Sequence, residues 1–151
     1  MAHQNESTHR LVESIANART WLSKLDEATV REKPAPDRWS IAEVIGHLID
    51  SACNNHQRFI RAQDVESLEF PKYDQNRWVA NGDYDDSPWL ELVELWSLYN
   101  LQLARIIARI PDDQLETPCT ISPYEPCKLG FLVSDYVDHH LAKIQERIAE
   151  R

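Results

Sequence analysis

This chain of 151 residues has few glycines, only short apolar runs and no segment that resembles a secretory signal. Only three glycines are present, which argues against a β-rich fold, and neither G-x-x-x-x-G-K nor G-x-G-x-x-G occurs. No phosphate-cradling nucleotide loop is therefore predicted. The longest apolar runs are a few residues, too short to cross a bilayer. The polar N-terminus has no apolar core of a secretory signal, so we expect a cytoplasmic protein.

Cysteine is also rare, and its spacing excludes the common cysteine-based frameworks. Cys53, Cys119 and Cys127 are an odd number of thiols without a C-x-x-C pair. This pattern is typical of a reducing cytoplasm rather than of a disulfide scaffold. Cys119 and Cys127 flank a short loop and could pair, but nothing in the sequence predicts a reactive, low-pKa thiol.

The charge balance is acidic, with 25 Asp and Glu against 16 Lys and Arg and a net charge of -9. Nucleic-acid binding calls for clustered basic residues, and anionic membrane surfaces also attract basic proteins. We therefore expect neither partner. The length predicts a single domain, over residues 1–151, with one sizeable core.

Four segments repeat apolar residues with the period of an α-helix, at about residues 8–25, 40–63, 87–110 and 129–149. The predicted fold class is therefore all-α, a four-helix bundle, with long connections at 64–86 and 111–128. The residues predicted to face the core are Leu11, Ile15, Ala18, Leu22, Leu25; Ile41, Val44, Ile45, Leu48, Ala52, Phe59; Leu92, Leu95, Trp96, Tyr99, Leu103, Ile106, Ile110; and Val133, Val137, Leu141, Ile144, Ile148.

Two helix starts carry recognisable signals. Ser40 followed by Glu43 predicts a capping box, in which each side chain accepts from a free amide of the first turn. Ser87 followed by Pro88 predicts a serine cap with proline at the first helical position. Connections longer than about a dozen residues are often functional. The aromatic residues of the first long connection, Phe70, Tyr73, Trp78 and Tyr84, either cover one mouth of the bundle or pack on its outside.

Histidines on two helices are the candidate metal ligands. On a helical wheel His47 lies on a polar flank of its helix with Ser51 and Asn54, and His56 lies on the other side. His140 falls on the apolar face of the last helix, where an imidazole needs a hydrogen bond or a metal. His139 falls to one side. The i, i+4 histidine pair typical of metal-binding helices does not occur.

Carboxylates near these histidines in sequence are candidates to orient an imidazole from outside the ligand set. They are Asp50, Asp135 and Asp138, and the alternative is that they are solvated helix charges.

Two motifs together resemble a known family. The spacing W-S-x-x-E-x-x-x-H-L occupies residues 39–48, and the closing helix reads L-G-F-L-V-S-D-Y-V-D-H at residues 129–139. With the long connection and the segment Trp96–Asn100, they resemble the DinB/YfiT-like superfamily over about residues 10–148. The resemblance implies one DinB-like four-helix domain with up-down-down-up helix order, and a homodimer.

The resemblance also implies a divalent metal, such as nickel or zinc, held by one histidine of the second helix and an H-x-x-x-H pair of the fourth. His47 matches the first ligand. Aligned without a gap, His139 takes the second position and Lys143 stands at the third. Aligned on the His-His-Leu triplet, His140 becomes the third ligand and Tyr136 replaces the second. We expect the ungapped alignment, because it keeps His139 on a flank comparable to that of His47, although the wheel alone favours His140.

The activity implied by the resemblance is metal-dependent thiol transfer, hydrolysis or isomerisation of a small molecule. His47 and His139 would hold the ion, and Tyr136, Lys143, Asp50 and Trp78 would line the pocket. One alternative is a metal-free bundle that binds a small molecule or acts in stress, without catalysis. Another is a purely structural homodimer.

Overall fold

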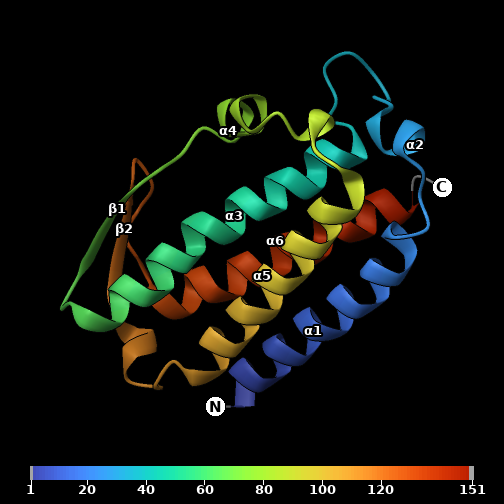
Figure 1. Cartoon of the computed structure of the whole chain (residues 1–151). Helices are drawn as coiled ribbons and strands as arrows, with labels where there is room; N and C mark the ends of the chain where they lie inside the picture. Colours follow the sequence, from blue (N-terminus) through green and yellow to red (C-terminus); the bar gives the residue numbers. More distant parts are fainter. Residues whose placement is uncertain (1, 150–151) are drawn as a thin grey trace.

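A computed structural model describes the backbone of residues 2–149 and the side chains of residues 4–146. Four long helices run up, down, down and up, which confirms the predicted bundle (Figure 1). Among the described residues no helix is both long and apolar enough to cross a membrane. The helices are α1 (Ala2–Leu22), α3 (Ile41–Arg61), α5 (Trp89–Arg109) and α6 (Leu129–Ala149). The short helical elements are α2 (Glu27–Arg31), α4 (Gln75–Gly82), η1 (Ala62–Asp64), η2 (Tyr84–Asp86) and η3 (Gln114–Glu116).

The start of α5 differs from the prediction. Pro88 occupies the cap position, and Ser87 makes no side-chain cap for the helix. The Ser87 amide instead donates to the Tyr84 carbonyl (3.2 Å) and closes η2, while the Ser87 carbonyl accepts from Arg31 (3.4 Å). The predicted serine cap is therefore wrong, because the turn before the helix uses this residue's backbone.

The apolar faces of the four helices meet in one core, as predicted for most positions. Trp89, Trp96 and Phe59 are among its largest fully buried side chains. Leu95 was expected to face the core but is 51% exposed. It lies about 100° around the helix from Trp96, which occupies the inward position. Ile148 lies outside the described side chains.

The two long connections form a small sheet that was predicted as loop. Strand β1 (Leu68–Pro71) pairs in parallel with β2 (Pro118–Ser122), and β2 pairs antiparallel with β3 (Cys127–Lys128). The sheet lies beside the C-terminal end of α3 and the start of α6 (Figure 1). Strands this short carry too few residues for a clear alternation, so periodicity could not reveal them.

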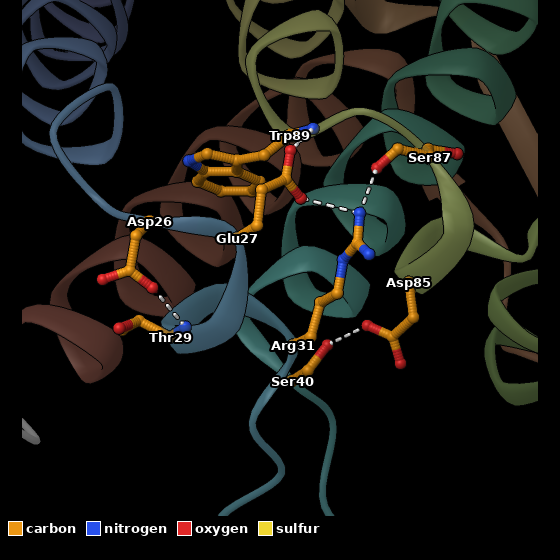
Figure 2. Close-up of polar contacts among 8 residues, drawn as sticks. All are labelled: Asp26, Glu27, Thr29, Arg31, Ser40, Asp85, Ser87 and Trp89. Atoms are coloured by element: carbon orange, nitrogen blue, oxygen red, sulfur yellow. Dashed lines mark hydrogen bonds and ion pairs between the residues drawn. The ribbon is translucent and has the colours of Figure 1, made fainter.

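Polar contacts fix the opposite end of the bundle, around the start of α3 and α5 (Figure 2). Glu27 pairs with Arg31 (2.6 Å) and also accepts from the amide of Trp89 (3.2 Å). Ser40 donates to Asp85 (2.6 Å), which links η2 to the first turn of α3. These contacts hold the returning connection against α3, the helix that carries His47.

Candidate functional site

The capping box predicted for α3 is present and sets the position of His47. The Glu43 amide donates to the Ser40 hydroxyl (3.1 Å), and the Ser40 amide donates to the Glu43 carboxylate (2.9 Å). His47 follows one turn later and is 1% exposed, with its ring centroid 4.9 Å from that of Trp39. The predicted polar flank is therefore buried, because Trp39 and α6 cover it.

His139 of α6 meets His47 at this flank. The Nε2 atoms of the two imidazoles lie 3.0 Å apart, and the rings stand edge to face with centroids 5.3 Å apart. His139 is half-buried, and Nδ1 of His47 has no hydrogen-bond partner among the described residues. The structure thus joins two of the three predicted ligands, the pair that the ungapped alignment implies.

His140 turns away from this pair into the core, as its place on the wheel predicts. It is 1% exposed and stacks on Trp96, with ring centroids 5.7 Å apart and planes 9° apart. Neither ring nitrogen has a partner among the described residues, and burial lowers the pKa of His140 to about 3. Within the described part of the chain, no three His, Cys, Asp or Glu side chains converge as a metal-binding group.

The paired imidazoles are electrically neutral at neutral pH. The pKa of His47 is lowered to about 4, mainly by burial, with smaller contributions in the same direction from His139 and Lys143. Burial also lowers the pKa of His139, with Lys143 acting in the same direction and Asp135 opposing it. A neutral imidazole has a free lone pair, which is the form that ligates a metal.

A cleft of about 1190 Å³ opens next to the histidine pair. Its walls come from α3, from the segment between β1 and α4, from the β2–β3 region and from α6. Tyr136, predicted as a pocket residue, lines it and donates to the side-chain Oδ1 of Asn100. The described residues that line the cleft are His47, Ser51, Asn55, Arg58, Lys72, Tyr73, Asp74, Gln75, Asn76, Ile121, Tyr124, Glu125, Pro126, Cys127, Phe131, Leu132, Asp135, Tyr136 and His139.

The other predicted pocket residues lie beside this cleft rather than in its lining. Asp50 is buried and accepts from the Tyr84 hydroxyl. Lys143 lines a neighbouring cavity of about 240 Å³ and lies 3.6 Å from Glu146. Trp78 is 38% exposed and contacts the ring of Tyr73, with centroids 5.3 Å apart. Their contact with a substrate stays a prediction.

The carboxylates and aromatic residues near the site divide between the cleft and the surface. Asp135 lines the cleft, whereas Asp138 pairs with Arg10 (3.3 Å) and does not reach an imidazole. Tyr73 covers part of the cleft, while Trp78 packs outside it. The two interpretations of the aromatic connection therefore apply to different residues: Tyr73 lines the cleft, and Trp78 packs outside it.

Sequence reasoning placed Ser51 beside His47 but missed Asn55 and Arg58 in the α3 wall of the cleft. It also placed Asn54 on this flank, although Asn54 does not line the cleft. Ser51, Asn55 and Arg58 follow His47 at spacings of four, four and three residues, which places all four on one face. Arg58 was the least expected, because it is only 9% exposed. The signal was available as a polar stripe at helical spacing, parallel to the apolar one.

The three cysteines are free thiols. Cys119 and Cys127 lie directly opposite each other in the β2–β3 pair. Burial raises the pKa of Cys119 to about 11 and also raises that of Cys127. This agrees with the absence of any sequence signal for an activated thiol.

The family model of the DinB superfamily matches residues 10–143 of this chain. The chain belongs to the DinB superfamily. A relative from Oceanobacillus iheyensis, named as a candidate metal-dependent hydrolase, is 23% identical over 141 residues, which are 91% of this chain and 77% of the relative.

Two solved structures share the DinB-like fold. YfiT from Bacillus subtilis, described as a probable metal-dependent hydrolase with an unusual four-helix bundle topology, superposes with a TM-score of 0.82. It is 20% identical, with 95% of this chain and 84% of YfiT covered. A mycothiol-dependent maleylpyruvate isomerase gives a TM-score of 0.67 at 16% identity, covering 93% of this chain but 60% of the isomerase.

Proposed function

We propose that this DinB-like chain is an enzyme that binds a divalent metal ion, nickel or zinc, between His47 and His139 and acts on a small molecule in the adjoining cleft. The observation that carries the proposal is the 3.0 Å approach of the two Nε2 atoms beside a cleft of about 1190 Å³. The names of the hydrolase relatives support the same reaction class.

The geometry of the pair fits two ligands of one ion. Zinc binds imidazole nitrogens at about 2.0–2.1 Å in tetrahedral sites, which places two such nitrogens roughly 3.3 Å apart. The observed 3.0 Å needs only a small adjustment to match. His47 and His139 would hold the ion, as two of the three protein ligands that are usual in catalytic zinc sites.

When bound, the metal would supply Lewis-acid chemistry, which lowers the pKa of a coordinated water or thiol. The chain's own residues would bind and orient the substrate. Tyr136 and Leu132 line the α6 wall, Ser51 and Asn55 line the α3 wall, and the cleft keeps the histidine pair largely away from bulk water. Lys143 lies 3.6 Å from Glu146, whose negative charge would partly offset the lysine's positive charge beside a bound cation.

A second candidate is a metal-free bundle that binds a small molecule in the same cleft. The 3.0 Å contact is also a good hydrogen bond if one imidazole carries its proton on Nε2. In that case the two Nε2 atoms are hydrogen-bonded to each other, and no ion is needed between them. The absence of a third converging ligand among the described residues favours this alternative.

The metal content of protein purified without a histidine tag, before and after soaking in nickel or zinc, tests the proposal. We expect close to one divalent ion per chain. His47→Ala and His139→Ala should each lose nearly all of it, because one imidazole alone holds such an ion weakly.

His56→Ala is the matched control for these variants. His56 lies on the same helix and is half-buried, but it bonds to the Tyr99 hydroxyl (3.0 Å) and does not line the cleft. This variant should keep its metal. If the protein holds no metal after soaking, or if all variants hold the same amount, the proposed metal site is wrong. The metal-free binding protein would then be the remaining candidate.

A further inference from the structure

Arg58 occupies the far end of the cleft from the histidine pair. It lies eleven residues after His47 on α3, and both side chains line the same cleft. At about 1.5 Å per residue, this separates the two positions by about 16 Å along the helix axis. The cleft is therefore long, with histidines at one end and a guanidinium at the other.

The guanidinium of Arg58 is buried and forms no ion pair with any described residue. The residue is 9% exposed. Nε has no partner, Nη1 makes a long bond to Asn55 (3.5 Å), and the group lies 5.4 Å from the centre of the Phe70 ring. A buried charge without a partner is unfavourable, and arginine remains protonated in proteins.

Around Arg58, the positive charge lies inside the cleft and the negative charges lie at its rim. Asp74, Glu125 and Asp135 are exposed, and Asp74 already accepts from the amides of Asn76 and Arg77 at the start of α4. None of these carboxylates forms an ion pair with Arg58 in the described structure. Burial lowers the pKa of Arg58, and the charge of Asp135 acts in the opposite direction. The buried part of this end is thus positive, although the whole chain is acidic.

A second cation lies near the mouth of this end. Lys72 is exposed, and its ammonium lies 5.1 Å from the centre of the Tyr124 ring. Both residues line the cleft. An oxyanion that entered here would meet Lys72 first and then the donors of Arg58, whose planar fork matches a carboxylate or phosphate.

We propose that Arg58 binds the oxyanion group, a carboxylate or a phosphate, of an elongated ligand whose other end lies at His47 and His139. This names a substrate class for the proposed function, and the role of the histidine end rests on that function. The oxyanion site itself is independent of any metal.

The first experiment uses the full chain with chelator present, so that no metal takes part. Glutarate and inorganic phosphate are titrated separately while the Arg58 Nε–H resonance is followed by NMR. We expect saturable shifts, and the anion that saturates at the lower concentration identifies carboxylate or phosphate as the preferred group. Binding that shifts only surface resonances would overturn the proposal.

Three variants separate binding from structure. Because both Arg58 variants lack the guanidinium Nε–H, their anion affinity is measured by isothermal titration calorimetry beside the unmodified chain. Arg58→Gln should raise the dissociation constant at least about tenfold, because it removes charge-assisted hydrogen bonds, and Arg58→Lys should raise it less. Arg61→Gln is the control, since Arg61 is exposed on the same helix and bonds to Gln57 (2.9 Å). Thermal unfolding shows whether each variant is folded. Equal weakening by the Arg61 variant would indicate general charge screening and overturn the proposal.

A third titration tests the length of the ligand. Mercaptoundecanoate is long enough to reach from Arg58 to the histidine pair, whereas glutarate is not. We expect the long acid to shift both the Arg58 Nε–H and the His47 ring resonances, and glutarate to shift only the first. A long acid that leaves His47 unchanged would overturn the elongated ligand. Because no metal is present, none of these results depends on the outcome of the metal test.

Discussion

Helices α1 and α3 have the same length, 21 residues each, but bury different kinds of side chain. Among the described residues of α1, Gln4 is the only buried polar side chain, and the rest of its buried face is one apolar stripe. Helix α3 adds six buried polar side chains to its apolar stripe. They are His47, Asp50, Ser51, Asn54, Asn55 and Arg58. Buried polar groups are costly, so the difference separates a helix that serves the fold from one that also forms a site.

Not every buried polar residue of α3 belongs to the site. Asn54 donates to the backbone carbonyl of Asp50 (3.0 Å), Asp50 accepts from Tyr84, and neither residue lines the cleft. Within the cleft lining, only His47 and Arg58 keep a buried nitrogen without a partner in the described structure. The unpartnered atom is Nε in Arg58, which an oxyanion in the cleft would complete, and Nδ1 in His47, whereas the proposed metal would bind Nε2 of that ring.

Removal of core volume from α1 should destabilise the fold and leave the cleft intact. Ile15 is 1% exposed, and Ile15→Ala should lower the free energy of unfolding by about 2–5 kcal/mol. Urea unfolding followed by circular dichroism measures the change. Val12→Ala on the same helix, where the side chain is 39% exposed, should cost less than about 1 kcal/mol. Weaker anion or metal binding by folded Ile15→Ala would show that α1 does influence the cleft.

On α3 the tightest packing involves Gly46 rather than a large side chain. A Cβ at this position would overlap the Tyr84 ring, so Gly46→Ala should cost roughly 1–3 kcal/mol of stability. Gly130→Ala on α6 gives the matched control, because its nearest neighbour is the Leu115 carbonyl oxygen at 3.4 Å. That variant should be neutral or more stable by up to about 1 kcal/mol through helix propensity. Equal thermal shifts in both variants would contradict the role of Tyr84.

The cap of α3 should contribute less than its core. Ser40→Ala removes the acceptor for the Glu43 amide and the donor to Asp85, and should cost about 0.5–2 kcal/mol. Ser40→Thr keeps a hydroxyl and should recover most of the loss. The free energies of unfolding of the two variants give the comparison. A Thr variant as unstable as the Ala variant would indicate that shape, not hydrogen bonding, matters at this position.

The sequence was sufficient for the parts of the fold that repeat regularly. The 3.6-residue period predicted α6 over its observed range and the core face of α1, and the Ser40–Glu43 signal predicted the start of α3. It did not predict the short strands: β1 pairs with a segment some 50 positions later in the chain, and β2 and β3 pair over only two residues each. It also misjudged Ser87, whose backbone serves the preceding turn.

The sequence predicted only those site residues that could be placed from their position on a single helix and from the family alignment. His47 and His139 were expected to meet, and the structure brings them together. Arg58 was missed because an arginine near a helix end normally reaches solvent, and its burial depends on Phe70 in β1, a distant segment. Asp50 was expected at the pocket, but Tyr84, again from a distant segment, takes its carboxylate.

The smallest change in the free energy of unfolding is expected at His140. This residue lies on the core face of α6, whereas His139 lies on the face that lines the cleft. His140→Leu replaces two buried, unpartnered ring nitrogens with apolar atoms of similar size beside Trp96. We expect the free energy of unfolding at pH 8 to stay within about 1 kcal/mol or to rise, because no hydrogen bond is lost. Metal loading should be unchanged in this variant and lost in His139→Leu. The reverse pattern, loss in His140→Leu and retention in His139→Leu, would make His140 the ligand and favour the alignment on the His-His-Leu triplet.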